Sequence, residues 1–297
     1  MTSSLRLDGV DRSFGDRQVL KNISFEVTAG RMTGFVGGNG AGKTTTMRII
    51  LGVLAPDAGQ LLWRGSRLTR QDRRRFGYLP EERGLYPKMT VREQIVHLGR
   101  LHGLDPATAR RNTDDLLDRV GLDGRGNDLL ETLSLGNQQR AQVAAALVHD
   151  PEVLVLDEPF SGLDPMAVDT VVSVLRERAR AGVPVLFSSH QLDVVERLCD
   201  DLVIIADGVI RAAGGREELR AAYTLPRFEL VVDGDAGWLR DEAGVTLVDL
   251  DGPRAVFDLA ADADDQRVLR DALARGPVRV FRPVTPSLAE IFREVNR

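Results

Sequence analysis

The chain has few of the residues that build disulfide frameworks, metal clusters or membrane spans. Cys199 is the only cysteine among 297 residues, which excludes an internal disulfide and a thiolate metal cluster. The longest apolar runs are far short of the roughly 18–20 residues that span a bilayer. Residues 1–8 lack the apolar stretch of a signal peptide. None of the histidines has metal-ligand spacing: His97, His102, His149 and His190. We therefore expect a soluble, cytoplasmic protein without a structural metal.

Charge gives a second exclusion. Only three lysines stand among the 39 basic residues, and the formal net charge is −5. A chain of this balance has no overall basic character, and no basic patch is apparent, so nucleic acid is not an expected partner. With 43% hydrophobic residues the chain is globular rather than disordered. Its length suits two domains of unequal size.

The order of apolar segments indicates the architecture of the first 215 residues. Residues 4–28 alternate like an antiparallel edge sheet. Met32–Val36 is a short apolar run that leads through glycines into a helical stretch. Residues 84–148 have helical periodicity, and strands alternate with helices from Val153 to Ile205. We predict an α/β domain over 1–215, with a parallel core sheet, an antiparallel edge sheet and a helical insertion at about 84–148.

The remainder of the chain has a different pattern. Gly214 and Gly215 precede residues 216–226 and Pro226 ends them, and we interpret this segment as a linker. Residues 227–297 then predict the order β-α-β-β-α-β, followed by a closing helix that begins after Pro286 with Ser287 as its cap. That order is compatible with a small α+β domain of the ferredoxin-like type.

A phosphate-binding loop lies between the first core strand and its helix. The pattern G-x-x-x-x-G-K-[ST] is matched by Gly37, Gly38, Asn39, Gly40, Ala41, Gly42, Lys43 and Thr44. Glycines let successive N–H groups turn toward phosphate oxygens, and the helix N-terminus adds a partial positive charge. Lys43 is expected to reach the β- and γ-phosphates, Thr44 to ligate Mg²⁺ and Thr45 to donate a further hydrogen bond. The alternative, a flexible glycine turn, does not explain the flanking strand and helix.

Two carboxylates follow the buried strand Val153–Leu156. Side chains at the carboxyl end of a parallel strand face the crevice where α/β sheets bind ligands. Asp157 is expected to hold Mg²⁺ through water, and Glu158 to act as general base or to orient the attacking water. An acidic turn is the alternative interpretation, and the phosphate loop on the same sheet argues against it.

Residues 133–140, Leu-Ser-Leu-Gly-Asn-Gln-Gln-Arg, predict a helix start capped by Ser134. The octapeptide resembles the signature motif of the ATP-binding cassette (ABC) ATPases, with two substitutions from Leu-Ser-Gly-Gly-Gln-Gln-Gln-Arg. In that family this helix tip binds the γ-phosphate of ATP held by a partner subunit. The resemblance assigns this role to Ser134, Gly136 and Asn137. An ordinary capped helix is the alternative for the motif taken alone.

Other positions match family landmarks. By resemblance, Phe14 stacks on adenine, Asp164 lies in the loop that couples two sites across a dimer, and His190 is the switch histidine that contacts the γ-phosphate. Glu81 stands where the family usually has the glutamine of the Q-loop. It can either ligate Mg²⁺ or only couple the site to a permease.

Residues 80–87 and the octapeptide together resemble one branch, the ATP-binding subunits of ABC-2-type exporters, which often carry a small C-terminal accessory domain. The resemblance implies an ATPase that closes with a second copy of itself around two MgATP. It also implies integral membrane permease subunits as partners, which would place the chain on the inner face of the cell membrane. The alternatives are a soluble ABC ATPase that acts as a switch on ribosomes or DNA, and a nucleotide-binding regulator that barely hydrolyses ATP.

Overall fold

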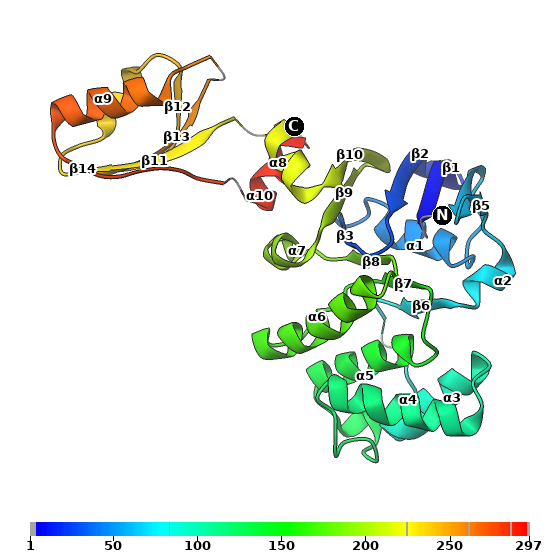
Figure 1. Cartoon of the computed structure of the whole chain (residues 1–297). Coiled ribbons are helices and arrows are strands. Elements are labelled where there is room, and N and C mark those ends of the chain that lie inside the picture. Colours follow the sequence, from blue (N-terminus) through cyan, green and yellow to red (C-terminus); the bar gives the residue numbers. More distant parts are fainter. Residues whose placement is uncertain (1–3, 83, 224, 261, 286, 296–297) are drawn as a thin grey trace. The chain divides into compact units, whose positions relative to one another are not determined.

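The computed structural model describes residues 4–82, 84–223, 225–260, 262–285 and 287–295 (Figure 1). Arg83 and Pro286, which belong to two of the sequence motifs above, lie outside the described residues. The chain divides into two compact units, Met1–Arg216 and Glu217–Arg297. Each unit is described below by itself.

A six-stranded sheet forms the centre of the first unit, in the order β10-β9-β3-β8-β7-β6. Its five parallel strands are β3 (Met32–Val36), β6 (Phe76–Leu79), β7 (Val153–Leu156), β8 (Val185–Ser188) and β9 (Asp201–Ala206), and β10 (Val209–Gly215) pairs antiparallel to β9 at one edge. Every residue of β3, β7 and β8 is buried, because both faces of a parallel sheet are covered. The phosphate loop and both carboxylates follow the carboxyl ends of these strands.

An antiparallel sheet packs against this core. Its order is β2-β1-β4-β5, with β1 (Leu5–Phe14), β2 (Arg17–Val27), β4 (Ala58–Trp63) and β5 (Ser66–Arg67). Alternate residues of β2, such as Ile23, Phe25 and Val27, are buried, whereas Glu26 between them is exposed. Those apolar side chains share one hydrophobic cluster with Phe35 and Val155 of the parallel sheet. The two sheets therefore enclose a common core, as a period of two in the sequence predicts.

Helices complete the first unit. They are α1 (Lys43–Ile50), α2 (Arg70–Arg73), α3 (Val91–Leu101), α4 (Pro106–Arg119), α5 (Leu135–Leu147), α6 (Pro165–Arg180) and α7 (Leu192–Leu198), with a 3-10 turn, η1, at Leu130–Thr132. Figure 1 shows α3, α4 and α5 gathered into one block beside the sheets. Their starts follow from local chemistry: Thr90 and Glu93 form a capping box on α3, and Asp105 caps α4 with Pro106 in its first turn.

The second unit is a four-stranded antiparallel sheet in the order β12-β13-β11-β14. Its elements are β11 (Arg227–Val232), the 3-10 turn η2 (Gly237–Asp241), β12 (Val245–Asp251), β13 (Arg254–Leu259), α9 (Asp265–Arg275), β14 (Val278–Pro283) and α10 (Leu288–Val295). Val268 and Ala272 of α9 pack with Leu230 and Phe257 in a separate hydrophobic cluster. The strand order and directions are those of a ferredoxin-like domain in which η2 replaces the first helix.

The structure confirms the predicted fold class, including the parallel core sheet, the antiparallel edge sheet and the helical insertion. It also shows a helix that the sequence pattern did not predict. The segment interpreted as a linker at 216–226 contains α8 (Arg216–Tyr223). Leu219 of this helix is buried, and its neighbours Glu218 and Arg220 are polar. The glycines before it belong to the end of β10 rather than to a loop.

Candidate nucleotide-binding site

The phosphate loop has the strained backbone that its glycines allow. Gly42 adopts a φ of +114°, and a Cβ there would lie 2.5 Å from Leu20 Cδ2. A Cβ on Gly37 would lie 2.4 Å from the backbone oxygen of Ile205. Lys43 donates from Nζ to the carbonyl oxygens of Gly37 and Gly38, at 2.7 and 3.2 Å. The ammonium group is therefore held over the loop that is expected to receive the phosphates.

A cavity of about 490 Å³ opens beside this loop and brings together most of the predicted site. Its lining includes the predicted residues Asn39, Gly40, Gly42, Lys43, Thr44, Thr45, Glu81, Asp157, Glu158 and His190. These come from the first turn of α1 and from the loops after β3, β6, β7 and β8, since parallel strands end at the same edge of a sheet. Arg17 and Val19 of β2 also line the cavity, and sequence reasoning missed both.

The predicted adenine-stacking residue lies elsewhere. Phe14 ends β1 with 47% of its surface exposed, and it is absent from the described lining of the cavity. The Arg12 guanidinium lies over its ring, 4.9 Å from the centroid. Phe14 nevertheless pairs with Arg17 across the β1–β2 hairpin, so an exposed aromatic ring stands next to a residue that lines the cavity. Its stacking role stays a prediction.

The acidic end of the site is built around a buried serine. Ser188 Oγ donates to Asp157 Oδ1 at 2.5 Å and accepts from the backbone N–H of Glu158 at 2.9 Å. Glu158 has a φ of +52°, which is rare for a residue with a side chain. Its carboxylate Oε2 lies 2.9 Å from His190 Nδ1. The two carboxylates and the histidine thus form one hydrogen-bonded group.

The donor set fits a hydrated magnesium ion. Asp157 is 2% exposed, yet its Oδ2 has no hydrogen-bond partner among the described residues. A buried carboxylate oxygen in this position needs a donor or a cation. Thr44, with its hydroxyl, lines the same cavity. The described residues contain no group of three or more His, Cys, Asp or Glu that could hold a metal alone. Mg²⁺ that arrives with nucleotide needs only one or two protein oxygens, because phosphates and waters supply the rest.

The signature motif forms the start of α5, as predicted. Ser134 caps the helix, and its Oγ accepts from the backbone N–H of Asn137 at 3.4 Å. Ser134, Gly136 and Asn137 are absent from the described lining of the nucleotide cavity, and the neighbouring Leu135 is 58% exposed. The tip of α5 thus offers its backbone N–H groups to the surface of the unit.

Two contacts nevertheless tie α5 to the segment that follows β7. Gln139 Nε2 donates to the carbonyl oxygens of Glu158 and Pro159, at 3.2 and 3.1 Å. A Cβ on Gly136 would lie 3.1 Å from the backbone oxygen of Gly162, so the helix tip packs on the loop that leads to Asp164. Asp164 itself caps α6 by accepting from the Ala167 N–H at 2.8 Å. The sequence motif contained Gln139, but its local pattern gave no sign of this link.

A second hollow lies on the other side of the Q-loop segment. We name this hollow the docking groove for the role proposed for it. It has a volume of about 360 Å³, is mostly apolar and is lined by Leu51, Arg73, Phe76, Tyr78, Pro80, Gly84, Leu85, Leu98, His102, Gln142, Ala145, Ala146 and His149. Pro80 lines the groove, whereas the next residue, Glu81, lines the nucleotide cavity. One peptide unit therefore separates the two hollows.

Two stacked histidines line the docking groove. The His102 and His149 rings lie 3.7 Å apart between centroids and 14° from parallel. His149 Nε2 is 3.2 Å from the carbonyl oxygen of Phe76. Burial, and then the charge of His102, lower the pKa of His149 to about 4. His149 is therefore neutral at physiological pH, which keeps the groove apolar.

Comparisons with known proteins agree with this geometry. Residues 20–161 match the ABC transporter family, and residues 214–296 match the C-terminal domain of DrrA1-3-like ATP-binding proteins. An ABC transporter ATP-binding protein of Bacillus subtilis, YhaQ, is 36% identical over 290 residues, which cover 98% of this chain and 97% of that protein. The chain belongs to the ABC transporter ATP-binding proteins. It is therefore an ATPase that binds nucleotide.

Two other relatives of this ABC subunit are named for resistance to a compound or for export. The linearmycin resistance ATP-binding protein LnrL of Bacillus subtilis is 34% identical over 72% of this chain and 70% of its own length. The Nod factor export ATP-binding protein I of Paraburkholderia xenovorans is 38% identical over 74% and 73%. A solved ATP-binding subunit of an ABC transporter is 32% identical with a TM-score of 0.68, covering 74% of this chain and 92% of that one. In the part of the chain that the structure describes, no helix is long and apolar enough to cross a bilayer.

Proposed function

We propose that this subunit powers an exporter by closing head to tail with a second copy of itself around two MgATP. One observation carries the proposal: the phosphate loop and the catalytic carboxylate line one cavity, while the signature helix tip lies outside it and is exposed. An exposed helix N-terminus without a lysine of its own suits a phosphate held by another chain. Relatives named for resistance and for export support the direction of transport.

The proposed chemistry is the attack of water on the γ-phosphorus of ATP. Glu158 would accept a proton from that water as its oxygen bonds to phosphorus, while the bond from phosphorus to the β–γ bridging oxygen breaks and ADP leaves. His190, beside Glu158 Oε2, would hold the carboxylate and contact the γ-phosphate. Mg²⁺, bound through the Thr44 hydroxyl and water on Asp157 Oδ2, would neutralise charge on the β- and γ-phosphates.

The proposed partner is a pair of integral membrane permease subunits of the ABC-2 type. Each would insert a short helix with an apolar face into the docking groove. Pro80 and Glu81 support this coupling, because consecutive residues line the groove and the nucleotide cavity. A change at the γ-phosphate that moves Glu81 would therefore move the wall on which the permease rests. The chain would then lie on the inner face of the membrane through its permease.

Purification from detergent-solubilised membranes tests this function. The tagged subunit should be recovered with an integral membrane protein of about six spanning helices, and that complex should hydrolyse ATP faster than the subunit alone. The alternative, a soluble switch, predicts recovery with ribosomes or DNA. Recovery with ribosomes and without any integral membrane protein would contradict the exporter.

A further inference from the structure

Six arginines lie within twelve residues, at Arg64, Arg67, Arg70, Arg73, Arg74 and Arg75. This segment, the arginine patch, covers β5 and α2. The expectation that the chain has no basic patch was therefore wrong. The net charge of −5 gave no sign of the patch, because acidic residues elsewhere in the chain outnumber the basic ones. All of its arginines except the half-buried Arg73 are exposed.

Carboxylates neutralise only part of the arginine patch. Glu152 pairs with both Arg64, at 3.3 Å, and Arg75, at 2.7 Å. Asp72 is the one acidic residue within the segment and lies 3.9 Å from Arg75. No carboxylate of the described residues lies within ion-pair distance of the four others, Arg67, Arg70, Arg73 and Arg74. The patch therefore keeps several positive charges on the surface, where they attract an anionic partner.

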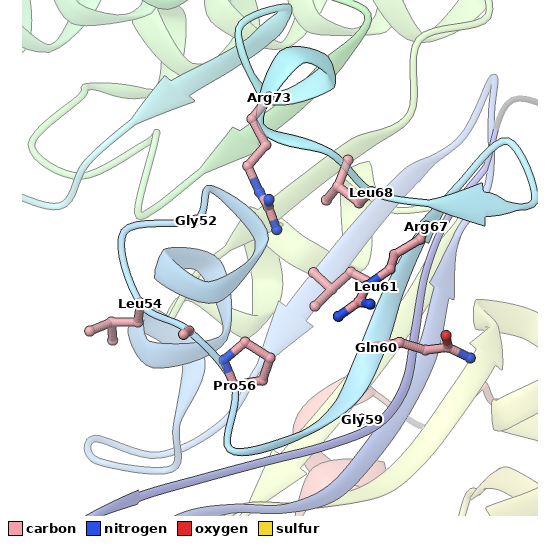
Figure 2. Close-up of a pocket in the computed structure, with 10 residues that line it drawn as sticks. Gly52, Leu54, Pro56, Gly59, Gln60, Leu61, Arg67, Leu68 and Arg73 are labelled. Atoms are coloured by element: carbon pink, nitrogen blue, oxygen red, sulfur yellow. The ribbon is translucent and has the colours of Figure 1, made fainter.

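Two of these arginines face a hollow that can receive an anionic group. Figure 2 shows the Arg67 and Arg73 side chains reaching toward the space between the loop after α1 and strand β4. The hollow measures about 260 Å³, and its other walls include Gly52, Pro56 and Gly59. Arg73 donates from Nε to the carbonyl oxygen of Ile50 at 2.8 Å, and burial lowers its pKa. The Arg73 guanidinium is thus fixed in place, partly dehydrated and unpaired with any described carboxylate.

The position of the hollow indicates the partner. Arg73 lines both this hollow and the docking groove, so the arginine patch continues the surface that receives the permease. A permease lies in a bilayer whose cytoplasmic leaflet is anionic, and basic residues beside such a surface bind lipid phosphates. The segment 64–75 contains no aromatic residue on which a nucleic-acid base could stack.

From these contacts we propose that the arginine patch binds the anionic phospholipid headgroups around the permease. The proposal rests on the proposed function, because the permease is what brings the patch to the membrane. It gives the subunit a second attachment beside the docking groove, one that weakens with salt. An anionic bilayer would thereby strengthen docking, while the nucleotide cavity is unaffected.

Flotation of the full chain with lipid vesicles, in the absence of permease, tests this proposal separately from the exporter function. The parent should bind vesicles of mixed phosphatidylglycerol and phosphatidylcholine, and not vesicles of phosphatidylcholine alone. Each arginine near an anionic surface strengthens binding by about fivefold, so Arg67→Gln/Arg70→Gln/Arg74→Gln should weaken it by about a hundredfold. ATP hydrolysis by this variant should equal that of the parent, since none of the three residues lines the nucleotide cavity.

A matched control removes the same charge elsewhere. Arg110→Gln/Arg111→Gln/Arg180→Gln changes three exposed arginines outside the patch and should bind vesicles like the parent. Equal losses in both triple variants would overturn the proposal, as would a parent that ignores phosphatidylglycerol or binds only RNA. Because no permease is present, such a failure would leave the co-purification result standing.

The buried hydroxyl of Ser188 carries an independent inference. Ser188 is fully buried at the end of β8, and its hydroxyl joins Asp157 Oδ1 to the backbone N–H of Glu158. With Oδ1 held, Asp157 is left with Oδ2 free of partners among the described residues. The same bond helps to hold the left-handed backbone of Glu158, a conformation that residues with a side chain rarely adopt.

We infer that Ser188 is a positioning residue that sets the Mg²⁺ carboxylate and the catalytic glutamate relative to each other. Without its hydroxyl, the Asp157 carboxylate can rotate and the Glu158 N–H loses its acceptor. Two losses should appear together. Weaker Mg²⁺ binding by the misplaced Asp157 carboxylate should raise the half-saturating Mg²⁺ concentration, and the misplaced Glu158 should lower kcat. Binding of nucleotide without Mg²⁺ should be unaffected.

Titration of Mg²⁺ against bound fluorescent nucleotide, together with steady-state hydrolysis, tests this role. Ser188→Ala should raise the half-saturating Mg²⁺ concentration and lower kcat by about tenfold each, as expected for loss of a buried hydrogen bond to a charged group. Ser188→Thr keeps the hydroxyl and should recover part of both losses. The control is Ser189→Ala, the adjacent buried serine, whose Oγ accepts from the Gln191 N–H. Identical Mg²⁺ dependence in Ser188→Ala and Ser189→Ala would overturn the inference.

Discussion

Two helix tips in the first unit have the same backbone chemistry but different surroundings. The N-terminus of α1 follows the phosphate loop and lies in a cavity that Lys43, Asp157 and Glu158 also line. The N-terminus of α5 has a serine cap and an exposed leucine, and it is absent from the described lining of that cavity. The α1 tip has the side chains expected to bind nucleotide, whereas the α5 tip offers only its helix N-terminus for contact with a phosphate. The difference supports the proposal that a complete site needs the α5 tip of another molecule.

The largest expected effect is on ATP hydrolysis, from a change to a residue that lines the nucleotide cavity. Glu158→Gln removes the proposed base while it keeps the shape of the side chain, so kcat should fall by roughly a hundredfold to ten-thousandfold. ATP should still bind, and size-exclusion chromatography should show a trapped dimer. Glu177→Gln, an exposed glutamate paired with Arg119, is the control and should hydrolyse ATP normally. Hydrolysis at the parental rate by Glu158→Gln would show that the base has been misassigned.

A charge placed on the other tip should separate binding from hydrolysis. Gly136→Asp puts a carboxylate where the γ-phosphate of the partner's ATP is proposed to lie, and like charges in contact cost several kcal/mol. Hydrolysis and ATP-induced dimerisation should fall by about a hundredfold, while each monomer binds ATP as tightly as the parent. Equilibrium binding and light scattering measure the two quantities. Loss of ATP binding by the monomer would place the α5 tip in its own cavity and break the comparison.

The opposite end of α5 should respond to acid. His149 follows α5, and its folded-state pKa of about 4 lies below the unfolded value of 6.5. The unfolded chain therefore binds more protons in this window, and the folded state loses stability as the pH falls through it. Between pH 7.5 and 5 the loss attributable to His149 is about 2 kcal/mol.

Chemical denaturation at both pH values measures this loss. His149→Phe keeps a ring against His102 and cannot be protonated, so its stability should depend less on pH. His97→Phe, at an exposed histidine of α3, is the control and should preserve the pH slope of the parent. An unchanged pH slope in His149→Phe would contradict the assignment.

The smallest expected effect concerns Glu81. If this residue couples the site to the permease, Glu81→Gln should bind MgATP like the parent and should lose only the stimulation of hydrolysis by the permease. Isothermal titration with and without Mg²⁺ checks the first point. Complete loss of MgATP binding would mean that Glu81 is a direct ligand of the ion. The cavity beside α1 would then supply one more oxygen ligand for Mg²⁺.

Local sequence predicted the parts of the site that depend on a few neighbouring residues. The phosphate loop, the cap at Ser134 and the carboxylates after β7 are each encoded within about eight residues, because turn, capping and strand preferences act over that range. The fold class followed from the alternation of such segments, and α8 escaped because its polar sequence resembles a linker.

The links between segments could not be predicted in this way. Ser188 meets Asp157 across 31 residues, and Gln139 meets Glu158 across 19. These contacts depend on strand order and on the packing of α5 against the sheet. The same holds for Arg17 and Val19, which enter the cavity because a hairpin of the edge sheet folds over the phosphate loop. Resemblance supplied Phe14, yet the structure leaves it outside the described lining of the cavity.

Mixing two inactive variants tests the shared site most directly. Glu158→Gln lacks the base in both of its sites, and Gly136→Asp lacks the signature contact in both of its sites. A mixed dimer contains one site with an intact Glu158 from one chain and an intact Gly136 from the other. Mixed in equal amounts before ATP is added, the two variants should recover activity that neither has alone. The upper limit is about a quarter of the parental activity, because at most half of the dimers are mixed and each mixed dimer has one complete site. No recovery on mixing would contradict the shared site.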